Sequence, residues 1–315
     1  MSTGTQDKDT PQTVGDDPSE ELFDPGFLSQ LRSLFFKLRS RQNLTRHGAQ
    51  PTPATGFTRE FKDYRQYTPG DDYREIDWRL YARLEKLFIR LFEEVQEFHV
   101  HVVVDTSRSM VDPFGQKRVV ALRLAAALSY LALINGHRVS LLKLGDRVEQ
   151  EFHPLKGQGH VHNLLRRLEG LQFDGVTNLE RAMRGFRPAR DRKGIVFLLS
   201  DMFGQSLEDA TEASSAMGRW PVESHVVQVV HPSEASPDLS GELQLLDVET
   251  GETRRMWLTK RDIEQYRASF DRFVEEVHQS CARHRINHVR WPTDHAFEEM
   301  FLYLLSRGSA LAGDR

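Results

Sequence analysis

Acidic side chains follow two apolar runs of the sequence, at the points where buried strands would end. The run 102–104 leads directly into Asp105, and the run 196–199 leads into Ser200 and Asp201. If these runs form neighbouring strands, the two aspartates lie side by side at one edge of a sheet. Two carboxylates in that position repel each other unless a cation lies between them. The spacing therefore points to cation binding at this edge.

Hydroxyl groups accompany the first of these carboxylates. Ser107 and Ser109 lie two and four residues after Asp105, so a loop that turns off the strand can point both toward the same place. The segment 173–178, between two helical segments, offers a further side-chain oxygen. Carboxylate and hydroxyl oxygens are hard ligands, which suit Mg²⁺, Mn²⁺ or Ca²⁺ and suit Zn²⁺ or Cu⁺ poorly. These residues therefore predict a hard-cation site.

Strands and helices alternate over the part of the chain that must position these residues. The apolar and amphipathic patterns predict strands at 98–104, 138–144, 194–199, 224–230 and 288–291. They predict helices at 118–134, 161–168, 179–186, 207–217, 260–285 and 294–305. Hairpins are expected near 145–152 and 243–258. Continuous apolar strands separated by helices indicate a mostly parallel sheet that is covered on both faces. Functional sites in such sheets lie beyond the carboxyl ends of the strands.

The spacing of the oxygen ligands resembles that of a known family. Asp105-x-Ser107-x-Ser109, a distant Thr177 and then Asp201 after a buried strand are similar to the metal-ion-dependent adhesion site of von Willebrand factor A and integrin inserted domains. The resemblance implies an α/β, Rossmann-like von Willebrand factor A fold. It also implies that these five residues surround Mg²⁺, with Mn²⁺ or Ca²⁺ as alternatives. The serines and the threonine would donate oxygens directly, and the aspartates would act largely through bound waters.

One coordination position of such a site stays open for an acidic residue of a partner protein. Metal binding and partner binding are then interdependent. The residues alone leave a second interpretation open, in which Ser107 and Asp201 only cap the helices that follow them.

A second pattern lies upstream of the first carboxylate. The run 67–78 reads YTPGDDYREIDW, and Ala82-Arg83 and Glu93-Glu94 follow it. Over about residues 57 to 250 the chain resembles the bacterial domain-of-unknown-function fifty-eight family. Members of that family typically lie beside MoxR-type AAA+ ATPases, so the resemblance implies such an ATPase as a partner.

The upstream charges have two interpretations. They could form a paired network that locks this segment against the sheet. Alternatively, they could form a partner-recognition surface beside the metal. The candidate partner-binding residues are Arg74, Asp77, Trp78, Arg83 and Arg108.

Composition divides the chain into four parts. Residues 1–24 are acidic and polar, and we expect a disordered tail. Residues 25–97 hold the upstream segment and an amphipathic helix, and both are expected to pack on the main domain. The apolar face of that helix is predicted to comprise Leu28, Leu31, Leu34, Phe35 and Leu38. Residues 98–308 form the von Willebrand factor A-like domain, and 309–315 are expected to be a flexible C-terminus.

The overall composition argues against several other kinds of protein. A formal net charge of −4 gives no general drive toward nucleic acid. The apolar runs have the length of strands and fall short of the ~20 residues that a membrane span needs, so we expect no integral membrane segment. Cys281 is the single cysteine, which fits a reducing compartment, and we expect a cytoplasmic protein.

These observations favour a metal-dependent protein–protein interaction module that is not an enzyme. The family resemblance makes it an adaptor or cofactor for a MoxR-type AAA+ ATPase in complex assembly or maturation. The alternative is a metal-dependent hydrolase or phosphotransferase that uses Asp105. Ser107 stands where a phosphatase would carry a second aspartate, and the sequence has no G-x-S-x-G or P-loop lysine motif, which weakens this alternative. In a third interpretation, the metal only stabilises the loops.

Overall fold

The computed structural model describes residues 22–34, 59–94, 97–111, 115–188, 193–204, 206–246 and 253–307. The expected acidic tail lies almost wholly outside the described residues. The expected flexible C-terminus, residues 309–315, lies outside them as well.

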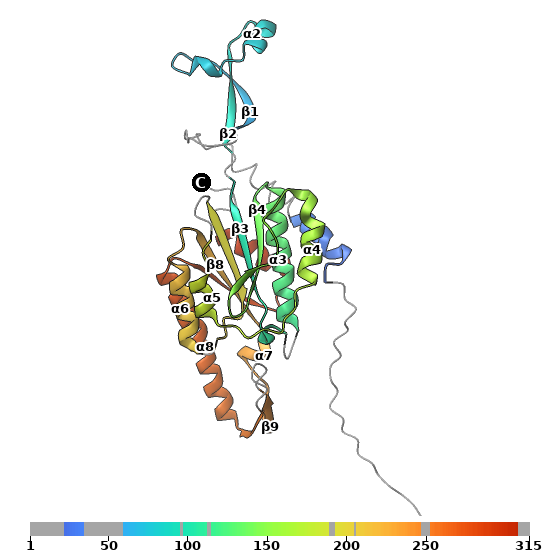
Figure 1. Ribbon diagram of the computed structural model, residues 1–315, viewed down its shortest axis with the longest axis vertical. Coiled ribbons are helices and arrows are strands. Elements are labelled where there is room, and N and C mark those ends of the chain that lie inside the picture. The colour runs from blue at the N-terminus through green and yellow to red at the C-terminus, as the bar shows by residue number, and fades with distance from the viewer. Residues whose placement is uncertain are drawn as a thin grey trace, which may run out of the picture.

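Within these ranges, a seven-stranded sheet forms the centre of the molecule (Figure 1). The strands run in the order β11-β8-β7-β3-β4-β5, and β6 also pairs with β4. The mutually parallel strands are β3 (His99–Asp105), β4 (Arg138–Leu144), β7 (Gly194–Ser200), β8 (Glu223–Val230) and β11 (Asn287–Pro292). The short β5 (Val148–Gln150) and β6 (Leu155–Lys156) pair with β4 in antiparallel fashion.

This strand order is that of a Rossmann-like fold, in which the chain order reverses between β3 and β7. The predicted fold class is therefore confirmed. In such folds, ligands bind at the carboxyl ends of the strands where the order reverses, which here are those of β3 and β7.

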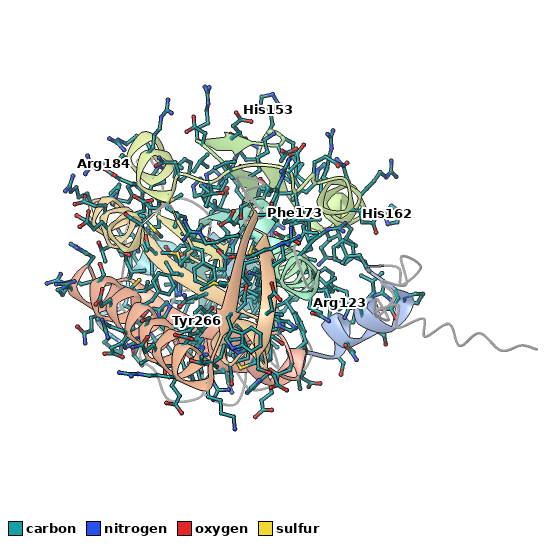
Figure 2. The ribbon with its side chains drawn as sticks, turned by 90° about the horizontal axis from the view of Figure 1, so that it is seen from below. Arg123, His153, His162, Phe173, Arg184 and Tyr266 are labelled. Atoms are coloured by element: carbon teal, nitrogen blue, oxygen red, sulfur yellow. The ribbon has the colours of Figure 1, made fainter. Side chains whose placement is uncertain are left out.

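Helices cover both faces of the sheet, because the central strands are apolar on both sides. On β3, Val102 and Val104 belong to one buried cluster, and Val103 belongs to the other. The first cluster includes residues of α3 (Gln116–Ile134), α4 (Val161–Glu169) and α9 (Phe297–Arg307). The second includes residues of α5 (Leu179–Gly185), α6 (Leu207–Met217) and α8 (Lys260–Arg283). Seen from below, the helices surround the sheet, and α4 with His162 lies well apart from α5 with Arg184 (Figure 2).

A helix over residues 25–34 packs against the first of these faces. Its buried side chains are Phe27, Leu31 and Leu34, while Leu28 is half-buried. The ring of Phe27 lies 5.6 Å from that of Phe297 on α9. The buried face of the helix is thus centred on Phe27, Leu31 and Leu34, and Leu28 lies at its margin. The other two predicted members of the face, residues 35 and 38, lie outside the described residues.

The upstream segment forms an arm that extends away from the sheet (Figure 1). Strands β1 (Arg59–Gln66) and β2 (Phe88–Glu94) form an antiparallel hairpin, and η2 (Tyr73–Glu75) and α2 (Trp78–Leu84) lie between them. We expected this segment to pack on the main domain, and the structure instead places it apart. Charges of the segment pair within the arm: Arg65 with Asp71 at 2.8 Å, and Arg90 with Asp77 at 3.9 Å.

A second hairpin lies near the opposite end of the molecule (Figure 1). The four-residue helix α7 (Pro232–Ala235) follows β8, and β9 (Gly241–Leu246) and β10 (Thr253–Leu258) then pair in antiparallel fashion before α8 begins. In the part of the chain that the structure describes, we find no helix with the length and apolar character needed to cross a membrane.

Candidate metal centre

The two predicted aspartates lie next to each other because β3 and β7 are adjacent parallel strands. Val104 of β3 is in register with Leu199 of β7, so both strands end at the same level. Asp105 ends β3, and Asp201 follows the last residue of β7. Both side chains are completely buried. The Ser200 hydroxyl donates to Asp105 Oδ2 at 2.5 Å and so ties the end of β7 to that of β3.

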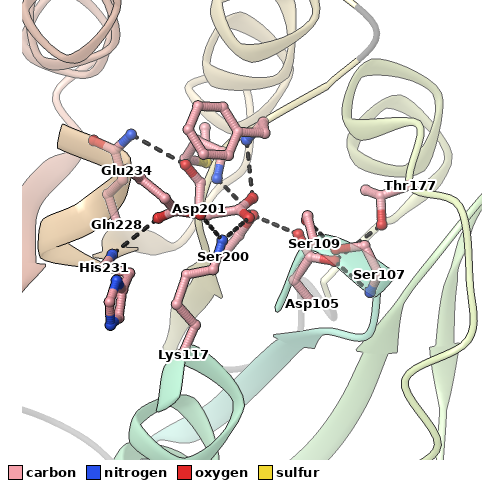
Figure 3. Close-up of polar contacts among 12 residues, drawn as sticks. Asp105, Ser107, Ser109, Lys117, Thr177, Ser200, Asp201, Gln228, His231 and Glu234 are labelled. Atoms are coloured by element: carbon pink, nitrogen blue, oxygen red, sulfur yellow. Dashed lines mark hydrogen bonds and ion pairs between the residues drawn. The ribbon is translucent and has the colours of Figure 1, made fainter. Parts of the chain in front are cut away.

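The loop that leaves β3 turns back on its own carboxylate. The Ser107 amide donates to Asp105 Oδ1 at 3.0 Å, and the Ser107 and Ser109 hydroxyls lie 2.9 Å apart (Figure 3). Ser107 precedes the short helix η3 (Arg108–Met110), but its side chain makes no capping hydrogen bond there. The hydroxyl is therefore directed into the site and does not serve the helix.

The second aspartate also has no capping role. Helix α6 is capped by Ser206, which forms a reciprocal pair of hydrogen bonds with Asp209. Asp201 Oδ1 instead accepts from the Phe203 amide at 3.0 Å. The interpretation in which Ser107 and Asp201 are only helix caps is thus wrong for both residues.

Thr177 reaches the site because its loop is held against the loop that leaves β3. The Arg108 amide donates to the Gly175 carbonyl at 3.2 Å, and the Gly175 amide donates to the Thr106 carbonyl at 3.3 Å. Two residues further on, Thr177 Oγ1 donates to Asp105 Oδ1 at 2.9 Å. All five predicted site residues therefore meet at the carboxyl edge of β3 and β7 (Figure 3).

Two further charged residues, which the sequence analysis missed, complete the site. Lys117, in the first turn of α3, donates to Asp201 Oδ2 at 2.9 Å and forms an ion pair with Glu234 of α7. The lysine side chain is only 2% exposed. Figure 3 shows it reaching up from α3 to Asp201. No spacing rule marks these residues, because 84 and 117 positions separate Lys117 from its partners.

Burial and mutual repulsion control the charges of the site. Burial, and then the nearby charge of Asp201, raise the pKa of Asp105 to about 6. Hydrogen bonds from Ser200 and Ser107 act in the opposite direction. Burial also raises the pKa of Glu234, although Lys117 opposes this. Asp105 and Glu234 thus ionise less readily than exposed carboxyl groups do.

The donor set fits a hard divalent cation. Two buried carboxylates and three hydroxyls face one another, and these are oxygen ligands of the kind that Mg²⁺ accepts. In the described ranges, no three His, Cys, Asp or Glu side chains are grouped as metal ligands. The site proposed here depends instead on the hydroxyls of Ser107, Ser109 and Thr177.

The candidate partner-binding residues fall in two places. Arg108 is exposed between the two serines of the site. Arg74, Asp77, Trp78 and Arg83 lie in the arm, which joins the sheet at the amino end of β3. The arm and the five-residue site therefore lie at opposite edges of the sheet (Figure 1). The arm therefore lies away from the five-residue site, whereas one interpretation of the sequence placed it beside the expected metal.

The chain is similar to known proteins in both sequence and structure. The family model described as "Protein of unknown function DUF58" matches residues 63–280. The "Uncharacterized protein Rv1480" of Mycobacterium tuberculosis is 27% identical over 242 residues, which cover 74% of each chain. Among solved structures, BatB from Bacteroides thetaiotaomicron is 13% identical with a TM-score of 0.41, and the match covers 69% of this chain and 100% of that one. A von Willebrand factor type A protein from Catenulispora acidiphila is 12% identical with a TM-score of 0.32, covering 45% and 35%.

Proposed function

This chain belongs to the DUF58 family of proteins of unknown function, and we propose that it is a metal-dependent protein-binding module. The observation that supports the proposal is the meeting of Asp105, Ser107, Ser109, Thr177 and Asp201 at one edge of the sheet. A bound Mg²⁺ would supply an electrophilic anchor for a carboxylate of the partner.

The protein's own residues have separate roles in this proposal. The hydroxyls of Ser107, Ser109 and Thr177 would hold the ion directly. Asp105 fixes two of the loops, because its Oδ1 accepts from the Ser107 amide and the Thr177 hydroxyl. Asp201 supplies the second negative charge. Arg108 is exposed beside the serines and would pair with acidic groups that surround the partner's carboxylate.

The hydrogen bonds of Asp105 favour binding over covalent catalysis. Both of its oxygens already accept hydrogen bonds, Oδ1 from Ser107 and Thr177 and Oδ2 from Ser200. Asp105 is also completely buried, so neither of its oxygens is exposed to a substrate in this structure. We therefore propose a protein that is not an enzyme, and we do not favour a hydrolase or phosphotransferase that uses Asp105.

The partner in this proposal is a MoxR-type AAA+ ATPase or another protein that offers an acidic residue to the metal. We propose a cytoplasmic adaptor in the assembly or maturation of a complex. The arm gives such an adaptor a second contact surface away from the metal, because Tyr73 and Trp78 are 65% and 63% exposed there. Large exposed aromatic side chains are typical of protein-binding surfaces.

Binding of a purified MoxR-type ATPase from the same genome tests the proposal. We expect the complex to form in Mg²⁺ and to be lost in EDTA or with Ser109→Ala. A matched control is Ser215→Ala, which changes a serine on α6, away from the site. Binding that is indifferent to both EDTA and Ser109→Ala would contradict a metal-dependent contact. Mg²⁺-dependent turnover of phosphoesters that Asp105→Asn abolishes would favour the hydrolase instead.

A further inference from the structure

Lys117 is an enclosed cation inside the proposed metal centre. Its ammonium group donates to Asp201 Oδ2 at 2.9 Å, pairs with Glu234 and lies 5.6 Å from the centre of the Phe203 ring. A buried ammonium is costly unless opposite charges surround it. The two carboxylates therefore account for the position of this lysine.

Glu234 is held in place independently of the lysine. Its other oxygen, Oε2, accepts from the His231 amide at 2.9 Å in a capping box at the start of α7. Pro232 stands at the first position of that helix and restricts its backbone. The carboxylate of Glu234 is thus a fixed part of the wall of the site.

The net charge of the four ionisable side chains at this site matches in size that of one divalent cation. Asp105, Asp201 and Glu234 carry three negative charges when ionised, and Lys117 carries one positive charge, so the group has a net charge of −2. Asp201 lies between Lys117 and Asp105, because its Oδ2 accepts from Lys117 and the hydroxyl of the preceding residue, Ser200, donates to Asp105. The lysine therefore removes part of the negative charge that a metal ion would otherwise meet.

We infer that Lys117 is a tethered cation that sets the affinity of the site for its metal, with Glu234 as its counter-charge. This inference rests on the proposed metal-dependent function. The ammonium keeps the loops assembled without metal, because it neutralises one buried carboxylate permanently. The same charge weakens metal binding, so that the ion can exchange when a partner arrives or leaves.

Variants of the full chain that change the net charge of this group test the inference. Their Mn²⁺ affinity is measured from the electron paramagnetic resonance signal of the free ion. Lys117→Met leaves a net charge of −3, Glu234→Gln leaves −1, and the double variant restores −2. We expect Lys117→Met to bind Mn²⁺ about tenfold more tightly and Glu234→Gln about tenfold more weakly. The double variant should stay within about threefold of the wild type. Lys117→Arg, which keeps the charge, is a further control.

Thermal unfolding in EDTA supplies a readout that needs no metal. Lys117→Met leaves Asp201 and Glu234 buried without their cation, and its melting temperature should fall by roughly 10 °C. The double variant should regain most of this loss, and it keeps the test valid if Lys117→Met fails to fold.

Three results would overturn the inference. Equal Mn²⁺ affinity in the wild type, the double variant and Glu234→Gln would show that charge at this position does not control binding. A double variant as unstable in EDTA as Lys117→Met would assign the lysine a packing role. Failure of the wild type to bind Mn²⁺ would overturn the metal-dependent function, and the inference with it. That result differs from the first two, in which the wild type binds.

Discussion

Thr177 Oγ1 donates a hydrogen bond of 2.9 Å to Asp105 Oδ1, although 72 residues separate them in the sequence. The contact forms because the loop that contains Gly175 pairs with the loop that leaves β3. It joins the threonine and the first carboxylate of the site within one buried hydrogen-bond network. The hydroxyl therefore supports the position of Asp105 before any metal is present.

Thr177→Val should damage both stability and metal binding. The substitution keeps the shape of the side chain but leaves the buried Asp105 Oδ1 with one donor fewer. Loss of a hydrogen bond to a buried charged group costs about 1–3 kcal/mol, which urea unfolding in EDTA would measure. Mg²⁺ affinity by calorimetry should fall as well, because one hydroxyl donor is lost. Thr177→Ser keeps the hydroxyl and should stay close to the wild type in both measurements.

The stability of the metal-free protein should depend on pH through Asp105. Its pKa is raised to about 6 in the folded state, by burial first and by Asp201 second, whereas an unfolded aspartate titrates near ~3.9. The folded state thus binds this proton more tightly than the unfolded state does. The contribution of Asp105 to the free energy of unfolding is fully present below pH ~4 and is lost as pH rises through 6. The total loss is about 2–3 kcal/mol.

Asp105→Asn isolates this contribution, because an amide does not titrate. Urea unfolding in EDTA between pH 5 and pH 7.5 should give a wild type whose stability falls with pH relative to the variant. Other carboxylates, such as Asp71, whose pKa is lowered to about 2 chiefly by Arg65, act with the opposite sign and cancel in this difference. A difference that stays constant with pH would contradict the raised pKa of Asp105.

Removal of Mg²⁺ should lower the melting temperature more at neutral pH than at acid pH. Protonation of Asp105 competes with a divalent cation for the same site, so Mg²⁺ should bind more weakly below pH 6. The rise in melting temperature caused by Mg²⁺ should therefore be larger at pH 7.5 than at pH 5.5. Ser109→Ala, which removes a hydroxyl donor without changing any charge, should reduce the rise at both pH values. An equal rise at both pH values in the wild type would exclude metal binding at Asp105.

The sequence predicted the strands and the positions of the two aspartates at their ends because both leave a local pattern. β3 and β7 are buried on both faces and therefore read as unbroken apolar runs. The residue that follows such a run in a parallel sheet must lie at its carboxyl edge. Asp105 and Asp201 were placed correctly for this reason.

Lys117 and the arm could not be predicted in the same way. A lysine in the first turn of a helix is typical of a solvated surface, and only the tertiary placement of Asp201 and Glu234 makes it a buried cation. In the arm, mixed charges suggested pairing with the sheet. Arg65 instead pairs with Asp71, and Arg90 with Asp77, within the arm itself.

The helix over residues 25–34 should contribute strongly to stability. Phe27 is 4% exposed and lies against Phe297 of α9 and the guanidinium group of Arg123 on α3. Phe27→Ala should cost about 3–5 kcal/mol, because it removes a buried aromatic side chain and leaves a cavity. Gln30→Ala, on the exposed side of the same helix, should change the unfolding free energy by less than about 0.5 kcal/mol. Urea unfolding of both variants measures the difference.

Asp77 and Trp78, neighbours in the arm, should differ in how much they stabilise α2. Asp77 caps α2, accepting from the amides of Arg79 and Leu80 at 2.9 Å and 3.1 Å, and it also accepts from the Tyr64 hydroxyl. Asp77→Ala should therefore destabilise α2 by about 1 kcal/mol and speed amide exchange there. Trp78 packs edge-on against Tyr81 but is 63% exposed, so Trp78→Ala should leave amide exchange in α2 nearly unchanged.

Binding then separates the two residues of the arm. If the arm is a contact surface, Trp78→Ala should weaken ATPase binding at least tenfold while stability stays near that of the wild type, because exposed aromatic side chains carry much of the energy of protein interfaces. Asp77→Asn, which can still cap the helix, should retain the structure of α2 and so serves as the control for Asp77→Ala. Full binding by Trp78→Ala would remove Trp78 from the contact surface and leave Arg108 and the metal edge as the place to search.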